Sequence, residues 1–295
     1  MSSLRLVRQS GGRYEVIEQD FSFQHRDGKR LNCTVRLPHA GTRLPVIVVA
    51  PGFRGFKDWG FFPYLACRLA ESGLLSLAFN HALSGVGEQD REITDFEAFS
   101  RNSTTQELND WELLLDSILS ASFPYSNRAR LDALGVVGHS RGGSYGLLMA
   151  TRFRPIRSVV TWGSIQTFQR YTAEQKQQWR QSGRLELGAS SQGQPLFLRT
   201  AALDALERNE ARLDVLRAVR ELTIPVLILQ GREDRVVPLA DALRLWQCSD
   251  QRLCRLHVVE QAGHTFRTQH PFTSASMPLR EATEQTVGWF QRTLR

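Results

Sequence analysis

Six short, continuous apolar runs restrict the fold of this chain more than any other feature of its sequence. They are LPVIVVA (44–50), LLSLAFN (74–80), ALGVVG (133–138), RSVVTWG (157–163), IPVLILQG (224–231) and CRLHVVE (254–260). Because polar residues do not alternate with the apolar ones, both faces of the predicted strands should be covered. Helical stretches lie between most of the runs, and this succession predicts crossover units in a mostly parallel sheet. We therefore expect an α/β fold.

The first 45 residues have a different pattern. The segments YEVIEQDFSFQH and RLNCTVRLP alternate between polar and β-branched or aromatic residues, and Asp27-Gly28 between them suits a tight turn. This pattern predicts an antiparallel hairpin at the start of the chain.

Two helices have clear signals. Thr104 is followed three residues later by Glu107, which predicts a capping box at the start of a helix. Its apolar face would consist of Leu108, Trp111, Leu115 and Ile118. Near the end of the chain, one helical face carries Leu279, Ala282, Val287, Phe290 and Leu294. We expect that last helix to pack over the sheet.

Residues 164–222 interrupt the alternation of strands and helices. They contain no strand-like run, and LFLRTAALDALERNEARLDVLRAVREL is strongly helical in composition. We interpret the block as a helical cap or lid inserted into a single domain of residues 1–295. The alternative is that these helices only extend the packing and never contact a substrate.

Composition indicates an ordinary globular protein, with 41% hydrophobic and 23% charged residues. No apolar stretch approaches the roughly 20 residues that span a bilayer, and MSSLRLVRQSGG lacks a signal-like apolar segment. We therefore expect a cytoplasmic protein without a membrane partner. The net charge of +7 is spread along the chain without a basic block, which argues against nucleic-acid binding. The oligomeric state is left open.

Four cysteines lack the spacing of a metal site or a redox pair; they are Cys33, Cys67, Cys248 and Cys254. We interpret them as small buried apolar residues. Neither a metal nor an organic cofactor is predicted.

The segment VVGHSRGG places Ser140 among three glycines directly after an apolar run and before a helical stretch. A serine held in a sharp turn between a strand and a helix needs glycine neighbours, since larger side chains would collide with the adjoining backbone. The segment therefore predicts an exposed nucleophilic hydroxyl.

A serine hydroxyl needs a base within hydrogen-bond reach and a third group that orients this base. Asp234 follows the run IPVLILQ, and His264 follows CRLHVVE. Since loops at the carboxyl ends of parallel strands gather at one edge of a sheet, Ser140, Asp234 and His264 should meet there. Glu233 is the alternative acid.

The segments VVGHSRGG, LQGREDRVVP and EQAGHTF resemble the nucleophile, acid and histidine motifs of the α/β-hydrolase superfamily. APGF, LAFNHALSGVGE and the insertion are similar to the dienelactone-hydrolase-like and cinnamoyl or feruloyl esterase-like branch. The resemblance covers roughly residues 44–292. It implies Ser140 as nucleophile, His264 as general base and acid, and Asp234, not Glu233, as the orienting acid.

The resemblance also implies an oxyanion hole built from the backbone N–H groups of Arg141 and Phe53. Pro51 stands where the commoner family pattern has a histidine, and proline cannot donate a backbone hydrogen bond. The backbone hole is unaffected by this difference, whereas a side-chain role at that position becomes doubtful.

The expected activity is that of a serine hydrolase cleaving a small-molecule carboxylic ester with a small or medium acyl group. Alternatives are a peptidase of the prolyl-oligopeptidase type, an acyltransferase, and a noncatalytic binding module on the same fold. We hypothesise that four further residues contact the substrate: Arg54, His81, Trp162 and His270. Lys57 is an alternative to Arg54. A group of aromatic residues either lines an acyl pocket or only contributes to packing in the protein interior. These residues are Trp162, Phe168, Trp179 and Phe197.

Overall fold

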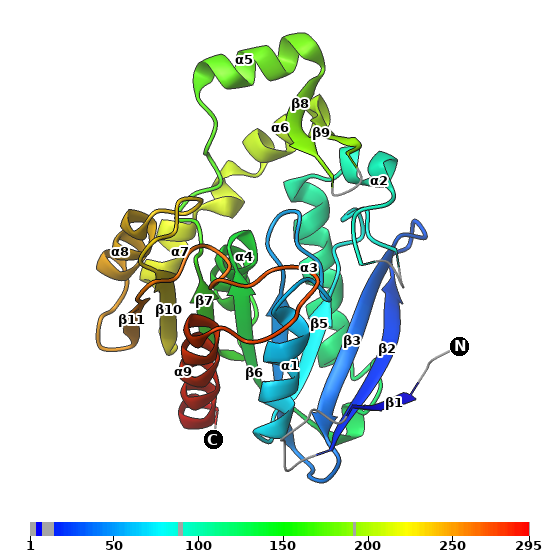
Figure 1. The fold of residues 1–295 in the computed structure, drawn as a ribbon, viewed down its shortest axis with the longest axis vertical. Coiled ribbons are helices and arrows are strands. Elements are labelled where there is room, and N and C mark those ends of the chain that lie inside the picture. The colour runs from blue at the N-terminus through cyan, green and yellow to red at the C-terminus, as the bar shows by residue number, and fades with distance from the viewer. Residues whose placement is uncertain (1–3, 8–14, 88–90, 191–192, 295) are drawn as a thin grey trace.

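The computed structural model describes residues 4–7, 15–87, 91–190 and 193–294. Within these ranges a nine-stranded sheet has the order β1-β2-β3-β5-β4-β6-β7-β10-β11 (Figure 1). Its strands are β1 (Leu4–Val7), β2 (Val16–Gln24), β3 (Arg30–Pro38), β4 (Leu44–Ala50), β5 (Leu75–Phe79), β6 (Ala129–His139), β7 (Ile156–Trp162), β10 (Val226–Gly231) and β11 (Cys254–Val259).

The sheet is antiparallel from β1 through β3 to β5 and parallel from β5 to β11. The antiparallel start confirms the predicted hairpin, and Gly28 in its turn has a φ of +86°, which glycine adopts without strain. All six apolar runs form parallel strands. The predicted α/β class is therefore confirmed.

Helices cover both faces of the sheet, which explains the continuous apolar runs. On β4, Ile47 and Val49 pack in one core with α1 (Phe62–Glu71) and α9 (Met277–Thr293). Their neighbours Val46 and Val48 point the other way, as successive strand residues must. This second core includes residues of α3 (Thr104–Leu119), α4 (Arg141–Ala150), α7 (Val215–Glu221) and α8 (Leu239–Cys248). Figure 1 shows α1 and α9 together on one face.

The insertion differs from its prediction because it contains strands. It comprises α5 (Ala173–Ser182), β8 (Arg184–Ala189), β9 (Pro195–Arg199), α6 (Thr200–Arg208), a 3-10 turn (Glu210–Leu213) and α7. β8 and β9 form an antiparallel hairpin of their own, so the expectation of an all-helical block is wrong. The residues of β8 are half-exposed or exposed, which leaves no apolar run to detect. Figure 1 shows α5, β8, β9 and α6 standing above the sheet, whereas α7 packs beside it.

Two short helical segments complete the described chain: α2 (Phe96–Ser100) and a 3-10 turn (Ser126–Arg128). In the described residues, none of the helices is both long enough and apolar enough to cross a bilayer.

Helix α3 starts one residue away from the predicted capping box. Ser103 is the N-cap, and its Oγ accepts the Gln106 N–H at 3.3 Å. The expected pair of Thr104 and Glu107 is therefore wrong, because Thr104 is already the first helical residue. The Glu107 carboxylate is consequently free to make tertiary contacts.

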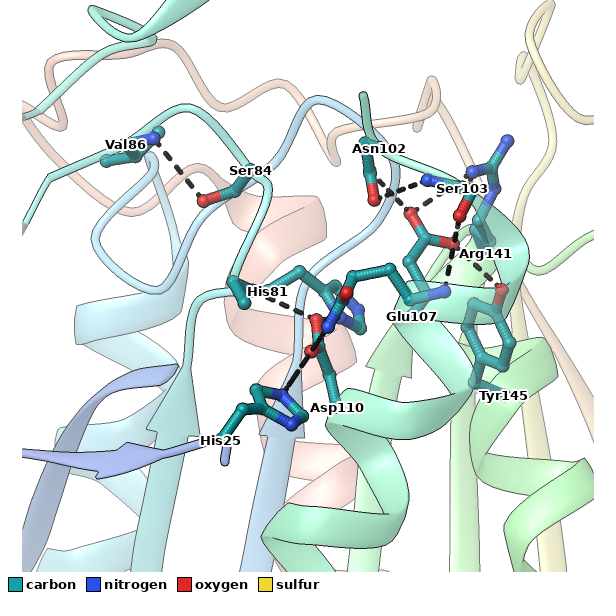
Figure 2. A network of polar contacts seen from close by, with 12 residues as sticks. His25, His81, Ser84, Val86, Asn102, Ser103, Glu107, Asp110, Arg141 and Tyr145 are labelled. Carbon is teal, nitrogen blue, oxygen red and sulfur yellow. Dashed lines mark hydrogen bonds and ion pairs between the residues drawn. The ribbon is translucent and has the colours of Figure 1, made fainter. Parts of the chain in front are cut away.

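Asp110 anchors α3 to the antiparallel edge of the sheet (Figure 2). Its fully buried carboxylate contacts His25 Nε2 at 2.8 Å and His81 Nδ1 at 3.0 Å, and it accepts the Ala82 N–H at 2.9 Å. Burial alone would raise the pKa of Asp110, but the hydrogen bonds from His25 and His81 outweigh it and lower the pKa to about 2. The group is thus a buried, fully satisfied anion.

Asp110→Asn should lower the free energy of unfolding by about 1–3 kcal/mol near neutral pH. Because the pKa in the folded state is about 2 and the unfolded value is roughly 3.9, the carboxylate stabilises the protein above pH 4 and loses this effect as pH falls toward 2. Urea unfolding from pH 3 to 7 measures the difference. Asp116→Asn on the exposed face of α3 is the control. A difference that keeps its full size at pH 3 would contradict the account.

Candidate active site

Ser140 lies at the turn between β6 and α4 in a backbone conformation that non-glycine residues rarely adopt. Its φ is 53° and its ψ is −124°. A Cβ on Gly138 would lie 2.4 Å from the carbonyl carbon of Gly142, and one on Gly142 would lie 2.4 Å from Pro51 O. No side chain fits at either position. The glycines thus let the loop after β4 press against the turn that presents Ser140.

Asp234 and His264 form a hydrogen-bonded pair at the same edge of the sheet. His264 Nδ1 lies 2.7 Å from Asp234 Oδ2. Asp234 Oδ1 accepts the backbone N–H groups of Val236 and Val237 at 2.8 and 2.9 Å. Burial tends to raise the pKa of Asp234, but the His264 hydrogen bond and these amides outweigh it and lower the pKa. An ionised Asp234 fixes the proton of His264 on Nδ1, so that Nε2 is left as the basic nitrogen.

The end of β7 connects Ser140 with this pair. The Ser140 N–H donates to Trp162 O at 2.7 Å. A Cβ on the next residue, Gly163, would lie 3.1 Å from Asp234 Oδ2 and 3.2 Å from His264 Nδ1. The consecutive residues Trp162 and Gly163 therefore connect the two parts of the site, since Trp162 contacts Ser140 and Gly163 lies next to the pair of Asp234 and His264. Glu233 is exposed and its carboxylate lies 3.9 Å from Arg267 Nη2, whereas the carboxylate that contacts His264 Nδ1 is that of Asp234.

His139, next to Ser140, makes a second link to the histidine loop. Its Nε2 donates to His264 O at 2.9 Å, and the two ring centroids are 4.5 Å apart. Burial, with a smaller contribution from His264, lowers the pKa of His139 to about 3. The ring is therefore neutral near pH 7, and its single proton is on the nitrogen that faces a carbonyl oxygen. Sequence reasoning treated His139 only as the variable residue of the turn.

The loop after β4 lies directly against Ser140. A Cβ on Gly52 would lie 2.9 Å from Ser140 Cβ. In the described parts of the chain, neither the Phe53 N–H nor the Arg141 N–H has a hydrogen-bond partner. Arg141 is the first residue of α4, whose opening N–H groups are unpaired and carry the positive end of the helix dipole. These two amides are available to a developing oxyanion.

The Arg141 side chain belongs to a buried cluster around Glu107 (Figure 2). Arg141 Nη1 lies 3.2 Å from both carboxylate oxygens, Tyr145 Oη donates at 2.8 Å, and Asn102 Nδ2 donates at 3.0 Å. The guanidinium also lies 4.2 Å from the centroid of the Phe53 ring. Glu107 thus joins α3 to the start of α4, directly beside the nucleophile.

Arg54 and Lys57 have structural partners. Arg54 donates to Leu187 O at 3.1 Å and to Ala189 O at 3.3 Å, which ties the loop after β4 to the hairpin of the insertion. The side chain of Lys57 is only 4% exposed, and its Nζ lies 2.6 Å from Asp58 Oδ2. A lysine enclosed in this way has no surface for a substrate.

The side chains of the remaining predicted contact residues also have structural partners. Trp162 is fully buried, and its indole N–H donates to Thr286 Oγ1 at 2.9 Å, so its side chain has a packing role in this structure. His81 is bound to Asp110. His270 accepts the Gly60 N–H at 3.0 Å and donates to Arg91 O at 2.8 Å.

Three aromatic residues named from the sequence have different surroundings. Phe168 and Trp179 line a small hollow beside Phe53 and Arg141. Phe197 lies instead on β9, where the Arg184 guanidinium is 5.3 Å from its ring centroid.

Gly142→Ala should destabilise the protein by about 1–3 kcal/mol or more, because its Cβ would meet the backbone oxygens of both Ala50 and Pro51. Gly288→Ala in α9 is the control, since its Cβ meets only the flexible end of Arg292 and alanine favours a helix by up to ~1 kcal/mol. Thermal unfolding measures both. Equal melting temperatures for the two variants would contradict the close approach of the loop.

Comparisons with known proteins identify the family and the fold of the chain. The sequence model of the alpha/beta hydrolase family matches residues 46–275. No curated protein matches the chain. The fold is similar to Est1E from Butyrivibrio proteoclasticus with ferulic acid bound, at a TM-score of 0.67 and 18% identity over 92% of this chain and 98% of that one.

Two further solved structures show the same fold. The esterase domain of a Rhodothermus marinus protein has a TM-score of 0.61 and 19% identity, covering 94% of this chain and 99% of that chain. Dienelactone hydrolase from Anabaena variabilis has a TM-score of 0.60 and 17% identity, with coverage of 94% and 99%. Together with the family match, these similarities confirm the expected resemblance, and the chain belongs to the alpha/beta hydrolase family.

Proposed function

We propose that this protein is a serine hydrolase that cleaves small-molecule carboxylic esters through an acyl-enzyme. The observation that carries the proposal is the 2.7 Å contact between His264 Nδ1 and Asp234 Oδ2 beside a serine held at a φ of 53°. Similarity to Est1E and to an esterase domain favours an ester over other acyl compounds.

In the proposed mechanism, Ser140 Oγ attacks the ester carbonyl while its proton passes to His264 Nε2. Asp234 keeps the other ring proton on Nδ1 and stabilises the resulting imidazolium. The tetrahedral intermediate then collapses, the alcohol leaves with the proton of His264, and the acyl group stays on Ser140. Water repeats the sequence, so that the acid is released and the hydroxyl of Ser140 is restored.

The proposed oxyanion hole consists of the backbone N–H groups of Phe53 and Arg141. Such preorganised donors supply about 2.7–4 kcal/mol each in acyl transfer. Pro51 leaves both amides in place, and its carbonyl packs against Gly142. The ionic pair of Arg141 with Glu107 holds the first turn of α4 and thereby the direction of the Arg141 amide.

We further propose that residues 164–222 act as a cap on a single catalytic domain. Arg54 supports this assignment, because it links the loop of the oxyanion hole to two carbonyls of the insertion. Arg199 makes a second link, with its Nη2 lying 2.6 Å from both carboxylate oxygens of Glu97. In this account Arg54 positions the cap and does not bind the substrate.

Ser140→Ala should lower kcat on 4-nitrophenyl acetate by about 10⁴- to 10⁶-fold, because no other group in the proposed mechanism forms the acyl-enzyme. A fluorophosphonate probe should label the wild type and fail to label the variant. If the wild type is labelled but does not hydrolyse esters, two further assays apply. Hydrolysis of a peptide anilide tests the peptidase alternative, and product analysis with added alcohol acceptors tests the acyltransferase alternative. Wild-type protein that is folded and unlabelled would indicate a noncatalytic binding module.

His139→Leu should lower kcat by about 10–100-fold with little change in KM, because the loop carrying His264 loses its link to the nucleophile strand. His139→Gln retains an N–H donor for His264 O and should keep most of the activity. Melting temperatures establish that both variants fold. If Leu and Gln lower kcat equally, the hydrogen bond to His264 O does not position the base.

A further inference from the structure

A small hollow lies beside the residues of the proposed oxyanion hole. It has a volume of about 20 Å³, which is room for one water-sized group. Its polar lining residues are Asn102, Ser103, Thr104 and Arg141, and its aromatic walls are Phe53, Phe168, Tyr171 and Trp179. We call this space the Thr104 hollow.

Thr104, one of the residues that line this hollow, has a hydroxyl without a partner in the described chain. The residue is 6% exposed, and its Oγ1 is buried without a hydrogen-bond partner among the described residues. Leaving a buried hydroxyl unpaired is unfavourable, so an unpaired one that lines a cavity points to a missing partner. Thr104 is also the first residue of α3, a helix of 16 residues, so unpaired backbone N–H groups surround it.

Arg141 has unused donors as well. Both contacts with Glu107 are made by Nη1, and Nε and Nη2 have no partner in the described chain. The side chain is 18% exposed, so these nitrogens are open to an incoming group. Glu107 already neutralises the guanidinium, and a second carboxylate would leave the cluster with a net negative charge in a largely buried place. The free edge of Arg141 therefore suits a neutral oxygen better than an anion.

The position of the hollow determines which part of the ester substrate, the acyl group or the alcohol, is closer to it. The leaving alcohol must lie near His264, which gives it a proton, so the acyl group extends the other way. Phe53 and Arg141 contribute both the proposed oxyanion amides and part of the wall of the hollow. An acyl chain whose carbonyl oxygen lay between those amides would therefore be next to two residues that also line the hollow.

We propose that the Thr104 hollow binds a hydroxyl group on the acyl chain, so that the preferred substrates are esters of hydroxy acids. The substrate oxygen accepts from Arg141 and its proton is donated to Thr104 Oγ1. The inference rests on the proposed esterase function and names its substrate class.

Two pairs of 4-nitrophenyl esters that exchange a hydroxyl for a methyl group test the proposal. They are 3-hydroxybutanoate with 3-methylbutanoate, and 6-hydroxyhexanoate with heptanoate. The ratio of kcat/KM within a pair should favour the hydroxy ester by about 5-fold or more for at least one chain length, as one or two net hydrogen bonds would give. A structural defect lowers both rates and leaves this ratio unchanged.

Thr104→Val should reduce that ratio severalfold, while Thr104→Ser, which keeps a hydroxyl, should preserve it. Thr283→Val is the matched control, because Thr283 in α9 also has a buried Oγ1 without a partner in the described chain. A wild-type ratio near one for both pairs, or an unchanged ratio in Thr104→Val, would overturn the proposal and indicate that only a water fills the hollow. Failure of the proposed function is distinguishable, since neither member of a pair would then be hydrolysed.

Discussion

The close approach of two backbone segments at the turn after β6 is the constraint on which the rest of the site depends. Gly138 and Gly142 leave no room for a Cβ, and the carbonyl of Pro51 occupies the space where a side chain would otherwise be. This contact sets the loop after β4 against Ser140, which is the arrangement that the proposed oxyanion hole requires. The strained φ of Ser140 persists because the surrounding packing determines it from both sides.

Charge around the site is arranged so that each buried ion is satisfied locally. Asp234 is held by His264 and two backbone amides, and Glu107 is held by Arg141, Tyr145 and Asn102. His139, lying against His264, is kept neutral by burial. A neutral neighbour matters for the proposed chemistry, because a second positive charge would disfavour the imidazolium that forms on His264. The site therefore supports one transient positive charge at a defined position.

Much of the fold, and the proposal for the principal site residues, followed from the sequence because both depend on local patterns and on topology. Continuous apolar runs indicated strands covered on both faces, and the carboxyl ends of parallel strands meet at one edge. The hairpin of β8 and β9 was missed because its residues are largely exposed and pair only with each other. Contacts such as His139 with His264 join residues 125 positions apart, for which the sequence has no signal. Charged residues among the buried positions of α3, namely Glu107 and Asp110, were a detectable sign of a buried polar cluster.

A crystal structure of the protein after reaction with a small alkyl fluorophosphonate would test the central claim most directly, because the phosphonyl group imitates the tetrahedral intermediate. The account predicts a covalent bond from Ser140 Oγ to phosphorus, with the phosphonyl oxygen about 2.7–3.1 Å from the backbone nitrogens of Phe53 and Arg141. It also predicts His264 Nε2 within hydrogen-bond distance of Ser140 Oγ. An adduct on another residue, or a phosphonyl oxygen out of reach of both amides, would contradict it.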